Sequence, residues 1–70
     1  VTGIVLLTVE RDRINTVAET IGIIDGISEV YSVGGRIDLI TIIRVRDNEQ
    51  ITGIVTTHLL KVEGIKKLKL

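Results

Sequence analysis

Residues 27–45, ISEVYSVGGRIDLITIIRV, decide the fold. They contain two runs of β-branched and aliphatic residues, 27–33 and 37–45, with Gly34 and Gly35 between them. Two glycines between strand-like runs favour a hairpin, because both central residues of a two-residue turn can require a positive φ. The second run is apolar on both parities, which is typical of a strand buried on both faces. The centre of the chain therefore predicts two adjacent antiparallel strands.

The segment before this hairpin predicts a strand and then a helix. Residues 3–10, GIVLLTVE, lack helical spacing and are also apolar on both parities. A helix follows, because four apolar residues fall at i, i+3, i+4 and i+7: Ile14, Val17, Ala18 and Ile21. Asp12 is the predicted N-cap of this helix, and Asp25 and Gly26 are expected to end the segment.

The segment after the hairpin again predicts a helix and then a strand. Asp47 and Gln50 have the spacing of a capping box, with Asp47 at the N-cap and Gln50 at N3. A second apolar stripe comprises Ile51, Ile54, Val55, Leu59 and Val62. Gly64 is expected to end the helix, and residues 65–70, IKKLKL, predict a final strand. Lysine on a short strand is common at the edge of a sheet.

The predicted order is β-α-β-β-α-β in a single domain, residues 1–70. The two halves resemble each other, since Gly26-Ile27 recurs as Gly64-Ile65. We therefore predict an α+β, ferredoxin-like plait, with an antiparallel four-stranded sheet and two helices on one face. The first and third strands are expected at its centre, because both are apolar on both parities.

The composition predicts an oligomer. Of the 70 residues 31 are apolar, and 29 of these are Ile, Val or Leu, whereas Phe, Trp, Met, Cys and Pro are absent. A chain this short buries only about 60% of its unfolded surface. Two helices cover one face of a sheet, so the other face would leave aliphatic side chains in water. We therefore expect a homodimer that packs sheet against sheet.

The same composition argues against several classes of protein. Nine basic and nine acidic residues and a single aromatic residue disfavour direct binding of nucleic acid. The longest wholly apolar run has four residues, too short to span a membrane, and no signal peptide is apparent. A cytoplasmic location is therefore expected. Without cysteine there is no disulfide and no thiolate metal site, and we expect neither a metal nor a cofactor.

Catalytic residues are not apparent, and we expect no enzyme. His58 is the only histidine and falls inside the second apolar stripe, which predicts a partly buried or boundary residue. Ser28 and Ser32 are the only serines, and neither belongs to a recognisable triad. A basic patch near the C-terminus comprises Lys61, Lys66, Lys67 and Lys69. We interpret it mainly as a solvated edge; subunit contacts or an acidic partner are the alternatives.

The hairpin is the best candidate for a binding site. If Gly34 and Gly35 are the two turn residues, Val33 faces Arg36, and Tyr31 faces Asp38. A free amino acid needs a carboxylate for its ammonium group, and amides or a guanidinium for its carboxylate. Two alternatives remain open: the glycines form a plain turn, or Arg36 and Asp38 pair with each other or with a neighbouring subunit.

At residues 30–45, VYSVGGRIDLITIIRV, the chain resembles the effector-binding domain of the Lrp/AsnC transcription regulators, also called the RAM domain. The positions that match the family pattern are Val33, Gly35, Asp38, Leu39, Asp47, Ile51 and Gly64-Ile65. Three positions depart from it: Gly34 stands in place of the usual Thr, Ile37 in place of Tyr, and Leu68-Lys69-Leu70 in place of Thr-x-Thr.

This resemblance implies a dimer formed through the sheets and a further assembly, with an octamer expected. It also implies amino-acid effectors that bind between dimers near the hairpin, at Gly34, Gly35, Arg36 and Asp38, to which we add Tyr31. Since no helix-turn-helix precedes the first strand, we expect a stand-alone RAM-type protein or the C-terminal part of a regulator. Full-length Lrp/AsnC regulators are possible partners. The leading interpretation is an amino-acid-sensing module in transcription regulation; the alternatives are a purely structural oligomerisation module and a dimeric α+β barrel enzyme.

Overall fold

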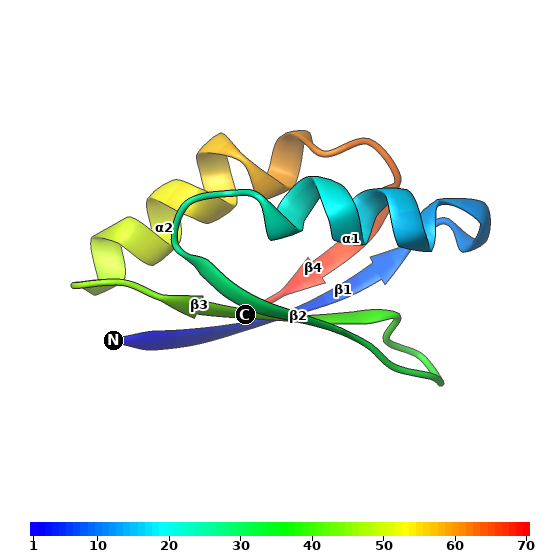
Figure 1. Cartoon of the computed structure of the whole chain (residues 1–70), viewed down its shortest axis with the longest axis horizontal. Coiled ribbons are helices and arrows are strands. Elements are labelled where there is room, and N and C mark those ends of the chain that lie inside the picture. The colour runs from blue at the N-terminus through cyan, green and yellow to red at the C-terminus, as the bar shows by residue number, and fades with distance from the viewer.

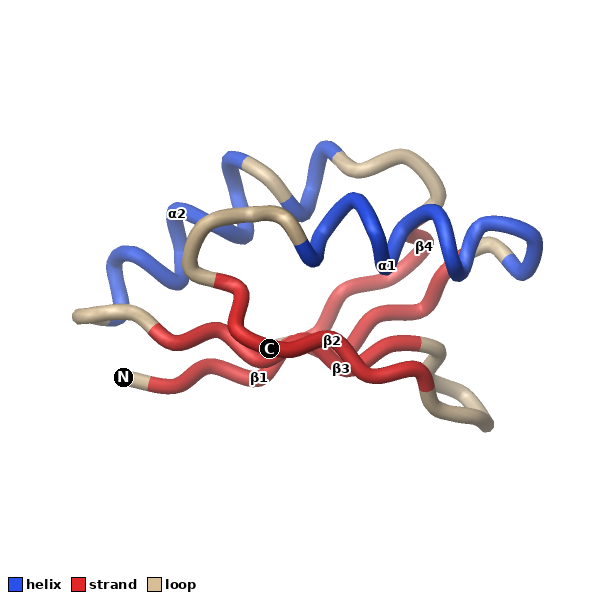
Figure 2. Tube along the Cα trace, in the orientation of Figure 1, coloured by secondary structure: helices blue, strands red, loops and turns tan.

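The computed structural model describes all 70 residues as one sheet covered on one face by two helices (Figure 1). The elements are β1 (Thr2–Val9), α1 (Ile14–Gly22), β2 (Ile27–Ser32), β3 (Leu39–Arg44), α2 (Asn48–Thr57) and β4 (Ile65–Lys69). Short 3-10 turns, η1 (Arg11–Arg13) and η2 (Leu59–Lys61), precede α1 and follow α2. The order β-α-β-β-α-β and the two layers, which Figure 2 separates by colour, confirm the predicted ferredoxin-like α+β plait.

The sheet has the strand order β2-β3-β1-β4, and every neighbouring pair is antiparallel. β1 and β3 are therefore central, as their apolar residues on both parities predicted. Their register pairs Leu6 with Ile40 and Leu7 with Leu39. Paired residues point to the same face, so each row of side chains across the sheet belongs either to the helix side or to the open side.

The resemblance between the two halves has a structural counterpart at Gly26 and Gly64. Each glycine lies between a helix and the following strand with a positive φ, +97° and +103° respectively. The Gly26 carbonyl accepts a hydrogen bond from the Arg44 backbone N–H at 3.0 Å, and the Gly64 carbonyl accepts one from the Glu10 N–H at 2.7 Å. Both glycines therefore anchor the strand that follows them to the neighbouring strand, in a backbone conformation that other residues rarely adopt.

The hydrophobic core lies between the sheet and the helices. Eleven apolar residues are buried there: Val5, Leu7, Val9, Val17, Ile21, Leu39, Ile43, Ile51, Ile54, Val55 and Leu59. One polar residue, Thr41 of β3, is also fully buried, and its hydroxyl has no hydrogen-bond partner. Neither helix has the length and hydropathy that a membrane crossing requires.

The other face of the sheet carries no helix and is exposed (Figure 1). Its centre is an apolar stripe from β1 and β3, made of Ile4, Leu6, Ile40 and Ile42, and Ile4 is 52% exposed. The solvent-accessible surface of the chain is 4767 Å². This is larger than the surface of about 4300 Å² expected for a compact monomer of 7.7 kDa. We call this surface the open face; it is the aliphatic surface that the composition anticipated.

The helix ends correct one prediction and confirm another. Asp12 is not the N-cap of α1, because η1 takes up residues 11–13 and Arg13 precedes the helix without a side-chain cap. Asp47 is the N-cap of α2, since its Oδ1 accepts a hydrogen bond from the Gln50 backbone N–H at 2.9 Å. The Gln50 side chain does not bond to the N–H of the N-cap, as in a standard capping box. Its Oε1 accepts instead from the N–H of the preceding residue, Arg46, at 2.7 Å.

Candidate functional site

The connection between β2 and β3 is longer than the sequence suggested. Ser32 pairs with Leu39, and the Val33 N–H donates to the Asp38 carbonyl at 2.9 Å. The hairpin loop, residues 33–38, therefore replaces the predicted two-residue turn. Tyr31 is opposite Ile40 and not opposite Asp38, so the predicted cross-strand pairs were wrong. Figure 1 shows this loop projecting beyond the end of the sheet.

Asp38 explains why the loop takes in residues that looked like a strand. Its backbone N–H donates to the Leu7 carbonyl at 2.9 Å, and its Oδ2 accepts from the Val9 N–H at 2.8 Å. The carboxylate thereby satisfies the N–H of Val9, the last residue of β1, which lies beyond the residues that pair with β3. The half-buried Asp38 side chain is thus fixed on β1, with Oδ1 left as a free acceptor.

Arg36, Gly34 and Gly35 form the exposed tip of the loop. Arg36 is held through its main chain, because its carbonyl accepts a hydrogen bond from the Thr8 hydroxyl at 3.2 Å. Its guanidinium forms no ion pair, so the alternative that Arg36 pairs with Asp38 within the chain does not hold. Gly35 has φ +87°, and no atom approaches either glycine where a Cβ would stand. The tip therefore presents backbone groups and one free cation.

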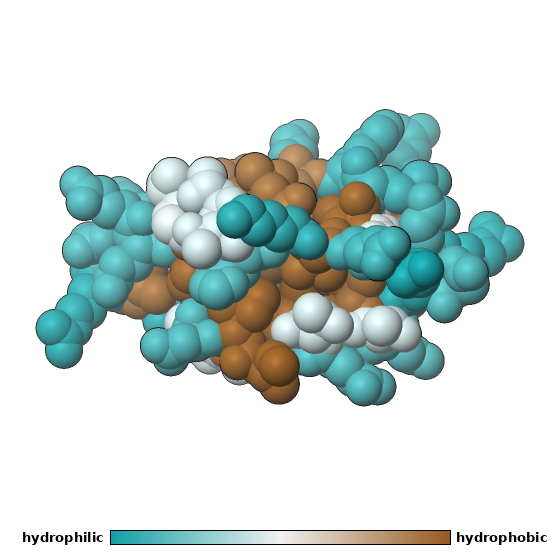
Figure 3. All heavy atoms as spheres, turned by 90° about the horizontal axis from the view of Figure 1, so that it is seen from above, coloured by the Kyte–Doolittle hydropathy of each residue, from teal (hydrophilic) through white to brown (hydrophobic).

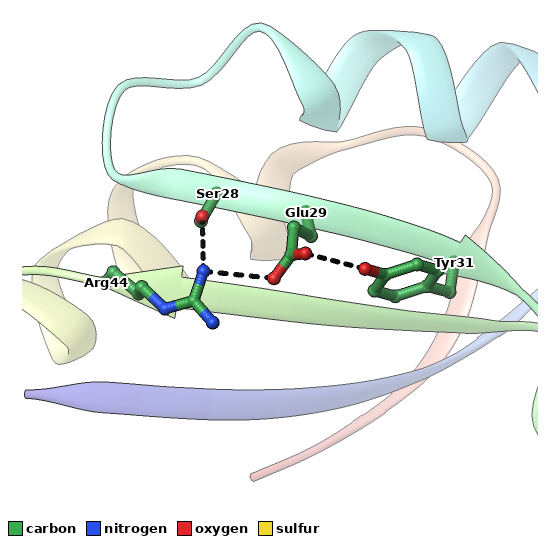
Figure 4. A network of polar contacts seen from close by, with 4 residues as sticks. All are labelled: Ser28, Glu29, Tyr31 and Arg44. Carbon is green, nitrogen blue, oxygen red and sulfur yellow. Dashed lines mark hydrogen bonds and ion pairs between the residues drawn. The ribbon is translucent and has the colours of Figure 1, made fainter.

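Tyr31 belongs to a polar network on the open face, which Figure 4 shows in detail. Its hydroxyl donates to Glu29 Oε1 at 2.6 Å, and Arg44 Nη1 donates to Glu29 Oε2 at 3.0 Å and to the Ser28 hydroxyl at 2.8 Å. The hydrogen bond from Tyr31 is the main reason why the pKa of Glu29 is lowered, with Arg44 adding to the effect. The same bond raises the pKa of Tyr31. Tyr31 is thus engaged with Glu29 and lies before the loop.

His58 lies on the helix side and is exposed, so its predicted place in the apolar stripe was wrong. α2 ends at Thr57, and the chain tightens into η2, so that Leu59 is buried as predicted while His58 is turned to the solvent. Thr57 and His58 border two shallow hollows of about 510 and 350 Å³, which are lined mostly by polar residues. From the helix side, apolar surface shows between the polar side chains (Figure 3). Neither hollow touches the hairpin loop, so a single chain does not enclose a ligand there.

The candidate residues therefore fall into two groups. The loop and β1 bring Gly34, Gly35, Arg36 and Asp38 together, whereas Tyr31 lies apart from them on the open face. No group of three or more His, Asp or Glu side chains is arranged to hold a metal ion. The sequence did not reveal the bonds that tie Asp38 and Arg36 to β1, because they depend on a strand about 30 residues away.

Comparison with known proteins identifies the family. The family model of the Lrp/AsnC ligand binding domain matches residues 2–70. The chain belongs to this family. The crystal structure of TTHA0845 from Thermus thermophilus is 32% identical in sequence and has a TM-score of 0.91, over 97% of this chain and 85% of that one. No curated protein matches the sequence significantly.

Two further structures share the fold of this Lrp/AsnC ligand-binding domain. FFRP-DM1 has a TM-score of 0.90 at 20% identity, over 97% of this chain and 91% of that one. The hypothetical protein PHS023 from Pyrococcus horikoshii has the same TM-score and identity, over 97% and 82%. At this identity the likeness concerns the fold alone. The family is that of a regulatory domain, in agreement with the resemblance seen at residues 30–45.

Proposed function

We propose that this domain is an oligomeric amino-acid sensor of the Lrp/AsnC regulator type, with its effector bound at a subunit interface beside the hairpin loop. The observation that carries the proposal is the loop, which contains the exposed Gly34 and Gly35, an Arg36 whose guanidinium forms no ion pair, and an Asp38 that keeps Oδ1 free. A guanidinium and amides suit the carboxylate of an amino acid, and a carboxylate suits its ammonium group. Membership of a family of ligand-binding domains supports the binding of a ligand.

The second part of the proposal is that another copy covers the open face. The apolar stripe of Ile4, Leu6, Ile40 and Ile42 would otherwise remain in water. Dimers of this kind would assemble further, with an octamer as the proposed form, and the effector would then lie between dimers. Because a ligand stabilises the state that binds it better, an effector at such an interface shifts the assembly equilibrium. The domain would influence transcription through assembly, including with full-length regulators, and not by touching DNA.

The two alternative functions differ from this proposal in what they require. A barrel-type enzyme would need polar reactive groups between the two sheets. His58 lies on the opposite, helix side, and Tyr31 on the open face is hydrogen-bonded to Glu29. A purely structural oligomerisation module needs no ligand. It is favoured by one observation, namely that no hollow adjoins the loop in the single chain. A measurement of ligand binding therefore distinguishes a sensor from a purely structural module.

The test of sensing is a calorimetric screen of the twenty amino acids at a protein concentration that maintains the oligomer. We expect heat from at least one amino acid and at least tenfold weaker binding by Asp38→Asn. This variant is informative because the amide oxygen of Asn can still accept from the Val9 N–H, while the negative charge is lost. Lys61→Gln, on the helix side, serves as the control and should bind normally. Absence of heat from all twenty would refute the sensing function.

The test of the dimer is sedimentation equilibrium of Ile4→Lys and of Leu60→Lys. Both side chains are exposed aliphatics, 52% and 63% accessible, but Ile4 lies on the open face and Leu60 follows α2. A lysine at position 4 would be desolvated in a sheet-to-sheet interface, so we expect this variant to be monomeric. Leu60→Lys should assemble like the wild type. Equal assembly of both variants would show that the open face is not the interface.

A further inference from the structure

The lysines of the open face lie at one edge of the sheet, and its carboxylate, Glu29, lies at the other, where Arg44 pairs with it. The strand register forms one row across the sheet, made of Tyr31, Ile40, Leu6 and Lys69, and a second row made of Glu29, Ile42 and Ile4. Lys67, paired with Thr8, points to the same face as Lys69. The lysines therefore lie along β4, and Glu29 lies on β2 at the opposite edge.

The two edges also differ in whether their charged side chains have partners within the chain. Lys67 and Lys69 are exposed and form no ion pair within the chain, since the two ion pairs are Arg13–Glu63 and Arg44–Glu29. On β2, Glu29 is held by Tyr31 and Arg44 but keeps part of its surface exposed (Figure 4). One edge thus offers free cations, and the other offers an oriented carboxylate beside an aromatic ring.

If the strands of the two sheets are aligned, as in the common face-to-face packing, this face can be stacked on a second copy in two ways. The same surface must serve on both sides of a two-fold interface. If the axis lies across the strands, like edges meet, and Lys67 and Lys69 of one copy face the same lysines of the other. If the axis lies parallel to the strands, opposite edges meet, and β4 of each copy lies over β2 of the other. Like charges placed face to face disfavour the first arrangement.

We propose, resting on the dimer proposed above, that the two-fold axis runs parallel to the strands and that Lys69 of each copy contacts Tyr31 and Glu29 of the other. Rotation about this axis lays the row of Tyr31, Ile40, Leu6 and Lys69 on itself in reverse. The ammonium group then meets the Tyr31 ring and the Glu29 carboxylate, both favourable partners. The same rotation brings Ile40 against Leu6 of the second copy at the centre of the interface.

Cysteine cross-linking tests this orientation directly, because the chain contains no cysteine. Tyr31→Cys and Lys69→Cys are made separately, one with a tag that changes its mass, then mixed and mildly oxidised. Within one chain these positions are three strand spacings apart, about 14 Å, so an internal disulfide is excluded. We expect a disulfide-linked heterodimer in the mixture and little cross-linking of either variant alone. Efficient cross-linking of Lys69→Cys with itself would overturn the orientation.

Charge-reversal variants test the same contact independently. Glu29→Lys and Lys69→Glu should each raise the dimer dissociation constant about tenfold, since each turns two attractive contacts into repulsive ones. The double variant restores opposite charges only if opposite edges meet, so its dissociation constant should return close to that of the wild type. Lys61→Glu is the matched control and should not change assembly.

The outcomes distinguish failure of the orientation from failure of the dimer. A wild-type chain that sediments as a monomer at all concentrations would refute the dimer and the orientation together. A wild-type dimer whose double variant stays as weak as the single variants would refute the orientation alone. Far-UV circular dichroism of each variant verifies that a loss of assembly is not a loss of fold.

Discussion

Replacement of Thr41 by valine is expected to stabilise the fold, although it removes a polar group from a central strand. Thr41 is fully buried on the helix side of β3, between Val5 of β1 and Val30 of β2 in the register. Its hydroxyl has no hydrogen-bond partner. Valine has nearly the same shape and a similar preference for strands, so the exchange leaves no cavity and no strain. The principal change is the removal of an unsatisfied hydroxyl from an apolar core.

The magnitude follows from the cost of burying a polar group without a partner, about 1–3 kcal/mol in proteins. We expect Thr41→Val to raise the free energy of unfolding by about 1–2 kcal/mol. For a domain of this size each kcal/mol corresponds to about 4–8 °C in Tm. Thr20→Val is the control: Thr20 is exposed on α1, and its exchange should change stability by less than about 0.5 kcal/mol.

The assay is urea and thermal unfolding followed by circular dichroism at one fixed protein concentration, because assembly makes Tm depend on concentration. The urea midpoint should rise while the m-value stays constant. A lower midpoint for Thr41→Val would refute the reasoning, because it would mean that the hydroxyl has a partner in solution, such as a buried water molecule.

Two further predictions concern a turn and the polar network. Gly26→Ala should destabilise the fold by about 2 kcal/mol, because φ is +97° and a Cβ would stand 2.5 Å from Ile54 Cδ1; Gly22→Ala, at an open helical position, should be neutral or stabilising in the same unfolding assay. Tyr31→Phe should raise the pKa of Glu29 toward its ordinary value of 4.5, measured by NMR titration of the carboxyl group. Because a lowered pKa stabilises the fold above the unfolded pKa and this contribution is lost as pH falls, the variant should also lose less stability on acidification than the wild type. Equal Glu29 titration in both proteins would contradict the second prediction.

Most of the fold could be predicted because short sequence patterns mark the turns, the helix starts and the central strands. Gly26 and Gly64 mark equivalent turns, and both have a positive φ where a strand is anchored to its neighbour. The spacing of Asp47 and Gln50 predicted the start of α2, because this cap is a local contact that needs no tertiary structure. The central position of β1 and β3 followed from their aliphatic residues on both parities, a pattern that indicates strands in the middle of a sheet.

The prediction failed where the conformation depends on distant parts of the chain. Two glycines suggested a two-residue turn, but Asp38 bonds to Leu7 and Val9 of β1 and thereby lengthens the loop. His58 has the spacing of a core residue, but α2 ends before it and η2 turns Leu59 inward. The candidate site was predicted only in part for the same reason. The loop residues were found from their types, whereas their geometry is set by β1.

The most direct test of the sensing function is an amide NMR titration of the ¹⁵N-labelled oligomer with the amino acid that gives the largest heat. We expect shifts concentrated on the amides of Gly34, Gly35 and Arg36, which saturate with the calorimetric affinity and are greatly weakened in Asp38→Asn. Shifts confined to the helix side, around Thr57 and His58, or no shifts at all, would contradict it.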